Sequence, residues 1–207
     1  MYLRVSAFKT DPAKLDEAIA YLKSRIIPTL SKSPGYAGAT CLVDREKGEG
    51  SASTLWESLE AMNNSETAGQ QSRTEFSEAT AVEIVDVDRF EMTDLEMVSP
   101  NIQLPSYVRL IIGYGDPKKA DRTTQLIRET APKLKAQPGF RAFTAGVNRM
   151  TGRGFTTSSW ATSEQREASN QATQQGRQQI TEAGGLYGVQ ISNLELVVAE
   201  VKLPIKA

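Results

Sequence analysis

The chain has 207 residues, of which 39% are apolar and 24% charged, with a formal net charge of −1. This balance leaves no surplus of Lys and Arg to neutralise phosphates, so we do not expect nucleic acid as a main partner. The sequence has no histidine and a single cysteine, Cys41. These counts exclude histidine-based catalytic triads, Cys/His zinc sites and an internal disulfide.

The same features lead us to expect a cytoplasmic protein that works without metal or cofactor. The longest apolar runs, Leu110–Ile112 and Leu196–Ala199, have the length of strands and cannot span a membrane. The first six residues lack the apolar core of a signal peptide and already alternate like a strand. A lone cysteine fits a reducing compartment, where it usually fills a core.

The first predicted element is a strand that begins at Tyr2. Leu3, Val5 and Ala7 share one face, and Tyr2 and Arg4 share the other. We expect the apolar face to pack against helices and the Tyr/Arg face to lie toward a second sheet.

A helix is predicted after Asp11-Pro12, because Asp is a good N-cap and Pro is favoured at the first helical position. Strands are then predicted at about 36–43 and up to Trp56, a helix from about Ser58, and a last strand at about 82–92. The predicted order β-α-β-β-α-β is that of a ferredoxin-like module, with both helices on one face of an antiparallel sheet.

This whole pattern occurs twice. Tyr2 aligns with Tyr107 and Asp11 with Asp116 at an offset of 105 residues, which falls to 104 before Pro28 and Pro132. The later pairs keep that offset: Pro34-Gly35-Tyr36 with Pro138-Gly139-Phe140, Trp56 with Trp160, and Phe90-Glu91-Met92 with Leu194-Glu195-Leu196. A period of about 100 residues is the size of a small domain rather than of a solenoid repeat.

The duplication predicts an α+β fold of two modules, residues 1–95 and 107–207, joined by a linker at 96–106. Helices would cover only one face of each antiparallel sheet, and the other face needs a partner. We therefore expect the two sheets to pack as an intramolecular pseudo-dimer, an α/β barrel, with a further homodimer left open.

With Thr54-Leu55-Trp56-Glu57-Ser58, the Pro34-Gly35-Tyr36 turn and this strand order, the chain resembles the antibiotic biosynthesis monooxygenase (ABM) type of dimeric α/β barrel, duplicated in tandem. The resemblance covers nearly the whole chain, once per half. It implies a fold shared by cofactor-independent oxygenases of aromatic polyketides or quinols, by haem-degrading oxygenases and by proteins with no assigned reaction.

Two departures argue against haem degradation. The haem-degrading branch has a histidine where this chain has Glu66 and Asn170, and an asparagine where it has Ser6 and Ile111. The resemblance implies instead that Trp56 and Trp160 line a substrate cavity, whereas ordinary core packing is the alternative for both.

Arg4 and Arg109 are the most unexpected charges, each beside a tyrosine in mid-strand, Tyr2 and Tyr107. They either form ion pairs and pack their stems, or stabilise a substrate anion. The six candidate substrate-binding residues are therefore Trp56, Trp160, Arg4, Arg109, Tyr2 and Tyr107. The halves differ at Asp86 and Asp88, which align with Gln190 and Ser192, so a working site could survive in one half.

Three functions remain open. The first is cofactor-independent oxidation of an aromatic or quinol-type substrate in an apolar cavity, with a small hydrophobic ligand as the partner. The second is a non-catalytic ligand-binding or stress-related barrel. The third is a pair of amino-acid-binding regulatory modules, which usually accompany an enzyme domain.

Overall fold

A computed structural model describes residues 1–99 and 102–202, which fall into two compact units. The first unit contains Met1–Arg89 and the described residues from Leu194 onward, and the second contains Phe90–Asn193. No helix in the described part of the chain is long and apolar enough to cross a membrane.

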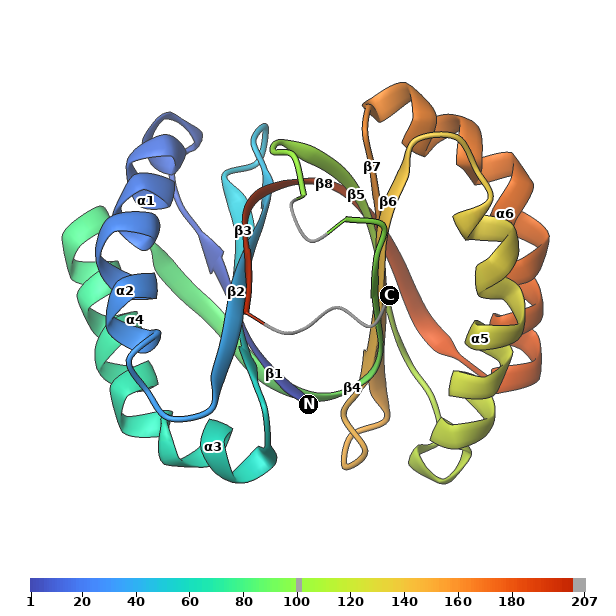
Figure 1. The fold of residues 1–207 in the computed structure, drawn as a ribbon, viewed down its shortest axis with the longest axis horizontal. Helices are drawn as coiled ribbons and strands as arrows, with labels where there is room; N and C mark the ends of the chain where they lie inside the picture. Colours follow the sequence, from blue (N-terminus) through green and yellow to red (C-terminus); the bar gives the residue numbers. More distant parts are fainter. Residues whose placement is uncertain (100–101, 203–207) are drawn as a thin grey trace. The chain divides into compact units, whose positions relative to one another are not determined.

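The first copy of the repeat has the predicted order of elements. Its elements are β1 (Tyr2–Lys9), a 3-10 turn (Pro12–Lys14), α1 (Leu15–Tyr21), a π-helical turn (Leu22–Ile26), α2 (Ile27–Leu30), β2 (Tyr36–Asp44), β3 (Glu49–Trp56), α3 (Leu59–Asn64), α4 (Glu66–Thr80) and β4 (Glu83–Met97). Asp11 caps the first helical segment, since its carboxylate accepts a hydrogen bond from Ala13 N at 2.9 Å. The helices α1, α2 and α4 lie on one face of the strands β1, β2 and β3 (Figure 1).

The second copy repeats that order. Its elements are β5 (Ser106–Tyr114), a 3-10 turn (Pro117–Lys119), α5 (Ala120–Lys135), β6 (Phe140–Val147), β7 (Arg153–Trp160), α6 (Ser163–Gly184) and β8 (Tyr187–Val201). The hydrogen-bonded strand order is β1-β3-β2-β8-β5-β7-β6-β4, which closes into an antiparallel barrel. The predicted α+β class with two ferredoxin-like modules in an α/β barrel is thus confirmed.

Strand registers show that the two copies are equivalent residue by residue. Tyr2 lies opposite Trp56 in the first copy, as Tyr107 lies opposite Trp160 in the second. Both copies also have a β-bulge directly after the turn into the second strand, after Tyr36 and after Phe140. The offsets found in the sequence therefore pair residues that hold the same structural position.

The change of offset from 105 to 104 coincides with a difference in helix geometry. The first copy has the π-helical turn Leu22–Ile26, whereas α5 runs without interruption from Ala120 to Lys135. A π-turn accommodates one extra residue without turning the following residues away from the core. Ile27 and Leu30 accordingly stay buried beyond it.

The predicted orientation of the first strand is wrong. Arg4, Ser6 and Phe8 are buried on the helix side, and Leu3, Val5 and Ala7 lie on the other face, partly exposed. The strand is apolar enough on both faces that alternation alone does not choose between them. The observed orientation places Phe8 on the helix side, where its ring packs edge-on against Phe76 of α4 with 5.9 Å between the ring centres.

The compact units are divided differently from the predicted domains. β4 and β8 are each 15 residues long, and the boundaries at Arg89/Phe90 and Asn193/Leu194 cut through them. Within the first unit, β2 pairs with the end of β8, and within the second, β6 pairs with the end of β4. Residues 100–101 of the predicted linker and 203–207 of the second predicted domain lie outside the described residues.

Candidate functional site

The second unit contains two large cavities between its helices and its sheet. One has a volume of about 470 Å³ and the other about 590 Å³. They share walls at Ile111, Ile127, Thr156, Arg177 and Ile180. The corresponding pocket of the first unit measures only about 40 Å³. Small-molecule sites usually occupy roughly 300–1,000 Å³, and the two cavities of the second unit are of that size.

Truncated side chains account for this asymmetry. At the repeat offset, the rings of Phe8 and Phe76, which fill the first unit, are replaced by Gly113 and Ile180. Four further positions lose volume or apolar character in the same way: Leu15 to Ala120, Ile19 to Thr124, Ile26 to Thr130 and Ile27 to Ala131. All of these replacements line one or both cavities. A buried Phe side chain contributes roughly 1.5–3 kcal/mol to the free energy of unfolding. The core of the second unit is therefore less stable than that of the first by several kcal/mol.

The last strand adds apolar walls to the smaller cavity. Gly188 has φ +59°, a left-handed conformation that favours glycine, and corresponds to Ile84, which lines the small pocket of the first unit. Beyond Gly188, Val189 and Ile191 line the cavity while remaining 38% and 53% exposed. The cavity is therefore apolar and open to solvent at this strand.

Two arginines form the charged part of the site. Arg109 of β5 is 3% exposed, and it donates to Ser169 Oγ at 2.9 Å and to the carbonyl oxygen of Arg166 at 2.5 Å. Arg177 of α6 lines both cavities and donates to Asn170 Oδ1 and to Thr173 Oγ1, each at 2.5 Å. Arg109 lines the larger cavity beside it.

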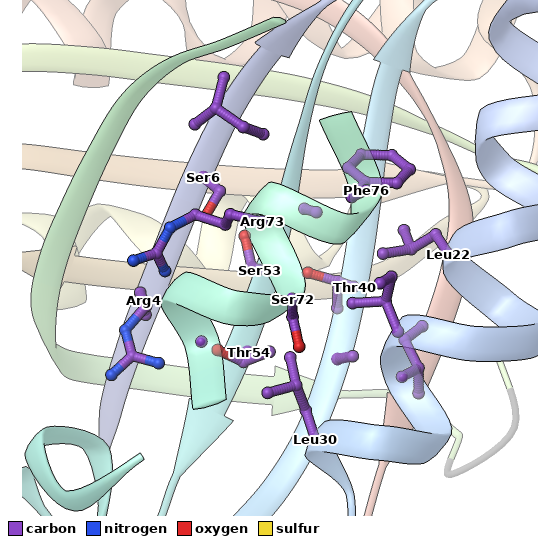
Figure 2. Close-up of a pocket in the computed structure, with 16 residues that line it drawn as sticks. Arg4, Ser6, Leu22, Leu30, Thr40, Ser53, Thr54, Ser72, Arg73 and Phe76 are labelled. Carbon is purple, nitrogen blue, oxygen red and sulfur yellow. The ribbon is translucent and has the colours of Figure 1, made fainter. Parts of the chain in front are cut away.

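The first unit shows the same arginines with a carboxylate. Arg4 donates to the carbonyl of Met62 and lies 3.0 Å from Glu66 Oε2, while Arg73 Nη2 lies 2.6 Å from Glu66 Oε1. Arg89 also pairs with Glu66, at 2.7 Å. Figure 2 shows Arg4 and Arg73 together on one side of the small pocket, with Phe76 and Leu22 on the other.

Asn170 takes the place of Glu66 in the second unit, and this removes the carboxylate. Within the part of the chain that the structure describes, neither Arg109 nor Arg177 forms an ion pair. Burial, followed by the positive charge of Arg177, lowers the pKa of Arg109 to about 10. Burial also lowers the pKa of Arg177, and the longer-range charge of Glu167 opposes the shift for both arginines. Both guanidinium groups are charged at neutral pH in a site that favours an anion.

Of the residues predicted to bind substrate, Arg109 lines the large cavity and Arg4 lines the small pocket. Trp56 and Trp160 are fully buried and are not among the described lining residues of the three pockets. Each indole N–H donates to a hydroxyl on the same strand, Trp56 to Thr54 at 3.0 Å and Trp160 to Ser158 at 3.3 Å. The guanidinium of Arg4 lies 5.6 Å from the centre of the Trp56 ring.

Tyr2 and Tyr107 are half-buried opposite these two indoles, and they too are absent from the described lining residues. The sequence reasoning did not select Arg177, Asn170 or the first-unit residue Arg73. Alignment of the two copies could have identified these residues, because it pairs Arg73 with Arg177 and Glu66 with Asn170.

No cluster of three or more Asp, Glu or Cys side chains suited to a metal ion occurs among the described residues. Cys41 is free and fully buried, and burial raises the pKa of its thiol to about 12. Such a thiol is unreactive at neutral pH. The chemistry available to the cavities therefore comes from arginine, hydroxyl and amide groups, together with the side chains of Asp116, Glu129, Lys133 and Glu182.

No family model matches the chain. Two uncharacterized proteins of Mycobacterium tuberculosis match a segment of 65 residues with 35% and 32% identity. The segment is 31% of this chain, and it spans only 28% and 29% of the lengths of those relatives.

Solved structures match nearly the whole chain at low identity. A candidate monooxygenase from Fusobacterium nucleatum has a TM-score of 0.72 and 12% identity, with 97% of this chain and 94% of that chain covered. An anthrone oxidase-like protein has a TM-score of 0.71 and 15% identity, with 100% and 95% covered. A ferredoxin-fold protein from Listeria monocytogenes, related to antibiotic biosynthesis monooxygenases, has a TM-score of 0.54 and 8% identity, with 93% of both chains covered. These similarities confirm the predicted resemblance: the chain has the fold of the ABM-type dimeric α/β barrel, duplicated in tandem within one polypeptide.

Proposed function

We propose that the second unit binds a small aromatic or quinol-type molecule and oxidises it with dioxygen, without a cofactor. The observation that carries this proposal is the emptied core between α5, α6 and the sheet, whose first-unit counterpart is filled. A core that gives up several kcal/mol of packing is typical of a binding site. The names of the compared structures, candidate monooxygenase and anthrone oxidase-like protein, support the choice of reaction class.

The arrangement suits chemistry in which the substrate itself supplies the electrons. For an anthrone-type substrate, a ring CH₂ becomes a C=O while dioxygen supplies that oxygen and leaves its other atom as water. The four electrons come from the substrate carbon, so atoms and electrons balance. The first step transfers a proton from the substrate to a carboxylate of the larger cavity, Glu129 or Glu182, and gives an enolate or phenolate.

Arg109 and Arg177 would stabilise that anion, because both line the larger cavity and carry uncompensated positive charge. Arg109 is almost fully buried and Arg177 half-buried, so water screens their charges only weakly. An anion that forms in the cavity therefore gains more from these two side chains than it would at the protein surface.

A non-catalytic ligand-binding barrel is the competing function. It is favoured by one observation, which is that the described residues lining the cavities include carboxylates and a lysine but no histidine, cysteine or tyrosine to relay a proton. Turnover therefore separates the two functions more sharply than binding does. We further propose that the protein works in the cytoplasm, where its single free cysteine stays reduced.

The test is oxygen consumption with anthrone in air-saturated buffer. The double variant Ala120→Leu with Thr124→Ile restores the first unit's residues at Leu15 and Ile19 and fills the smaller cavity. We expect the wild type to exceed the uncatalysed rate and the double variant to lose about 90% of that excess, which corresponds to roughly 1.4 kcal/mol in the barrier. Ile19→Val in the first unit is the matched control and should keep the wild-type rate. A wild-type rate equal to the uncatalysed rate would reject the oxygenase and leave the binding protein.

A further inference from the structure

The first unit contains an arginine pair equivalent to that of the second unit, with a carboxylate bound to both side chains. Arg4 and Arg73 hold Glu66 between them, with contacts of 3.0 Å to Oε2 and 2.6 Å to Oε1. Arg109 and Arg177 occupy the equivalent positions on β5 and α6. The first unit therefore shows what this pair of side chains binds when the position between them is occupied, namely a carboxylate.

The second unit keeps the arginines and loses the acid. Asn170 stands where Glu66 stands, and its amide oxygen accepts from Arg177 at 2.5 Å without neutralising any charge. An amide cannot compensate a guanidinium, and a buried charge is costly unless it is paired. Both cavities reach Arg177, and the larger one also reaches Arg109, so a ligand in the second unit can contact the pair.

From these two observations we propose that the natural ligand of the second unit carries a carboxylate, which binds between Arg109 and Arg177 in place of the missing Glu66 side chain. Its apolar ring system would then extend along Ile127, Phe155 and Ile180. The inference rests on the proposed function for the location of the site, and it names the class of substrate as aromatic carboxylates. One carboxylate compensates one guanidinium and leaves a positive charge for the anion formed in the reaction.

The distribution of charge around the pair is consistent with an external carboxylate. Glu167 acts on both arginines only at longer range, and the two carboxylates that line the larger cavity, Glu129 and Glu182, accept hydrogen bonds from Gln125 and Gln178. Among the described residues, Arg109 donates only to Ser169 and Arg166, which leaves further N–H groups of its guanidinium for a ligand. A bidentate carboxylate is the acceptor that matches such a fork.

The test compares two probes that differ only in charge, anthraquinone-2-carboxylate and anthraquinone-2-carboxamide. Their dissociation constants are measured by isothermal titration calorimetry, which requires no turnover. We expect the wild type to bind the carboxylate at least about tenfold more tightly than the carboxamide. Arg177→Gln should remove this preference, whereas Arg73→Gln, the same change at the equivalent position of the first unit, should retain it.

A second variant tests the equivalence of the two arginine pairs directly. Asn170→Glu supplies the missing carboxylate from the protein, so it should abolish the preference for the carboxylate probe and raise the melting temperature of the ligand-free protein. Equal affinities of the wild type for the two probes, or binding of neither, would overturn the inference. So would a preference that survives both Arg177→Gln and Asn170→Glu. Failure of the oxygen-consumption test alone would reject the oxidation and leave the carboxylate site in place.

Discussion

At the scale of single residues, the exchange of Glu66 for Asn170 between the copies removes the carboxylate from a cluster of arginines. Glu66 holds three arginines of the first unit together, and Asn170 cannot do the same in the second. The two clusters share one contact, since Arg4 and Arg109 each donate to a helix carbonyl at the same repeat position, Met62 and Arg166. They also differ at Arg89, whose counterpart in the second copy is Asn193. The first cluster is compensated by a carboxylate of the chain itself, and the second is the cluster for which we propose a ligand.

The role of Glu66 gives a prediction for pH dependence. Burial by itself would raise the pKa of Glu66, but hydrogen bonds from Arg73 and Arg89 outweigh it and the pKa lies below the ordinary value of 4.5. A lowered pKa in the folded state stabilises the protein above the pKa of the unfolded state, and this stability is lost as the pH falls through the folded value. The wild type should therefore lose stability below about pH 4.5. Glu66→Gln should lower the free energy of unfolding at pH 7 by about 1–3 kcal/mol and flatten this acid slope.

Denaturant unfolding at a series of pH values measures both effects. Asn170→Asp in the second unit is the matched comparison, because it adds a carboxylate beside Arg177 and should steepen the acid slope. An unfolding free energy of Glu66→Gln that falls with decreasing pH as steeply as that of the wild type would contradict the assigned role of Glu66.

At the scale of secondary-structure elements, the sequence predicted the order and most boundaries well. Asp11 and Ser58 cap helices as expected, and β3 ends at Trp56. These features depend on local chemistry, namely N-cap hydrogen bonds and turn residues, that a short stretch of sequence contains. β4 and β8 extend further than predicted, to 15 residues each, because their length depends on pairing with distant strands.

The orientation of the first strand could not be predicted for the same reason. Alternation identifies two faces, but only the contact between Phe8 and Phe76 shows which one meets the helices. The cavities were not predicted from the sequence either. Alignment of the copies does indicate one of them, because the large Phe8 is replaced by Gly113 at the same position. The candidate residues Arg4 and Arg109 were identified, but their helix-side partners were not.

The π-turn gives a prediction at this scale. Ser24 is an exposed residue within Leu22–Ile26, and deleting it should convert the turn into continuous α-helix, as in α5. We expect the free energy of unfolding to change by no more than about 1 kcal/mol, measured by urea denaturation. Deletion of Glu129 in α5 is the control. It turns Ala131 and Leu134 away from the core by about 100° and should cost more than about 3 kcal/mol. Equal losses for the two deletions would show that the π-turn does not absorb the extra residue.

At the scale of the whole molecule, the two copies differ in how their cores are filled, and the proposed function assigns stability to one and binding to the other. Phe8 and Phe76 close the first unit, and the smaller residues at the equivalent positions open the second. A protein remains folded while one part of its core is emptied only if other parts supply enough stability, because net stability is roughly 5–15 kcal/mol. Two copies in one chain make such a division possible, and the proposed single site depends on it.

The stoichiometry of ligand binding tests this central claim most directly. Titration of the wild type with anthraquinone-2-carboxylate in a calorimeter should give one site per chain, and the variant Ala120→Leu with Thr124→Ile should bind at least about tenfold more weakly. Two equivalent sites per chain, or full affinity in the variant with the filled cavity, would contradict the conclusion that the second unit alone forms the binding site.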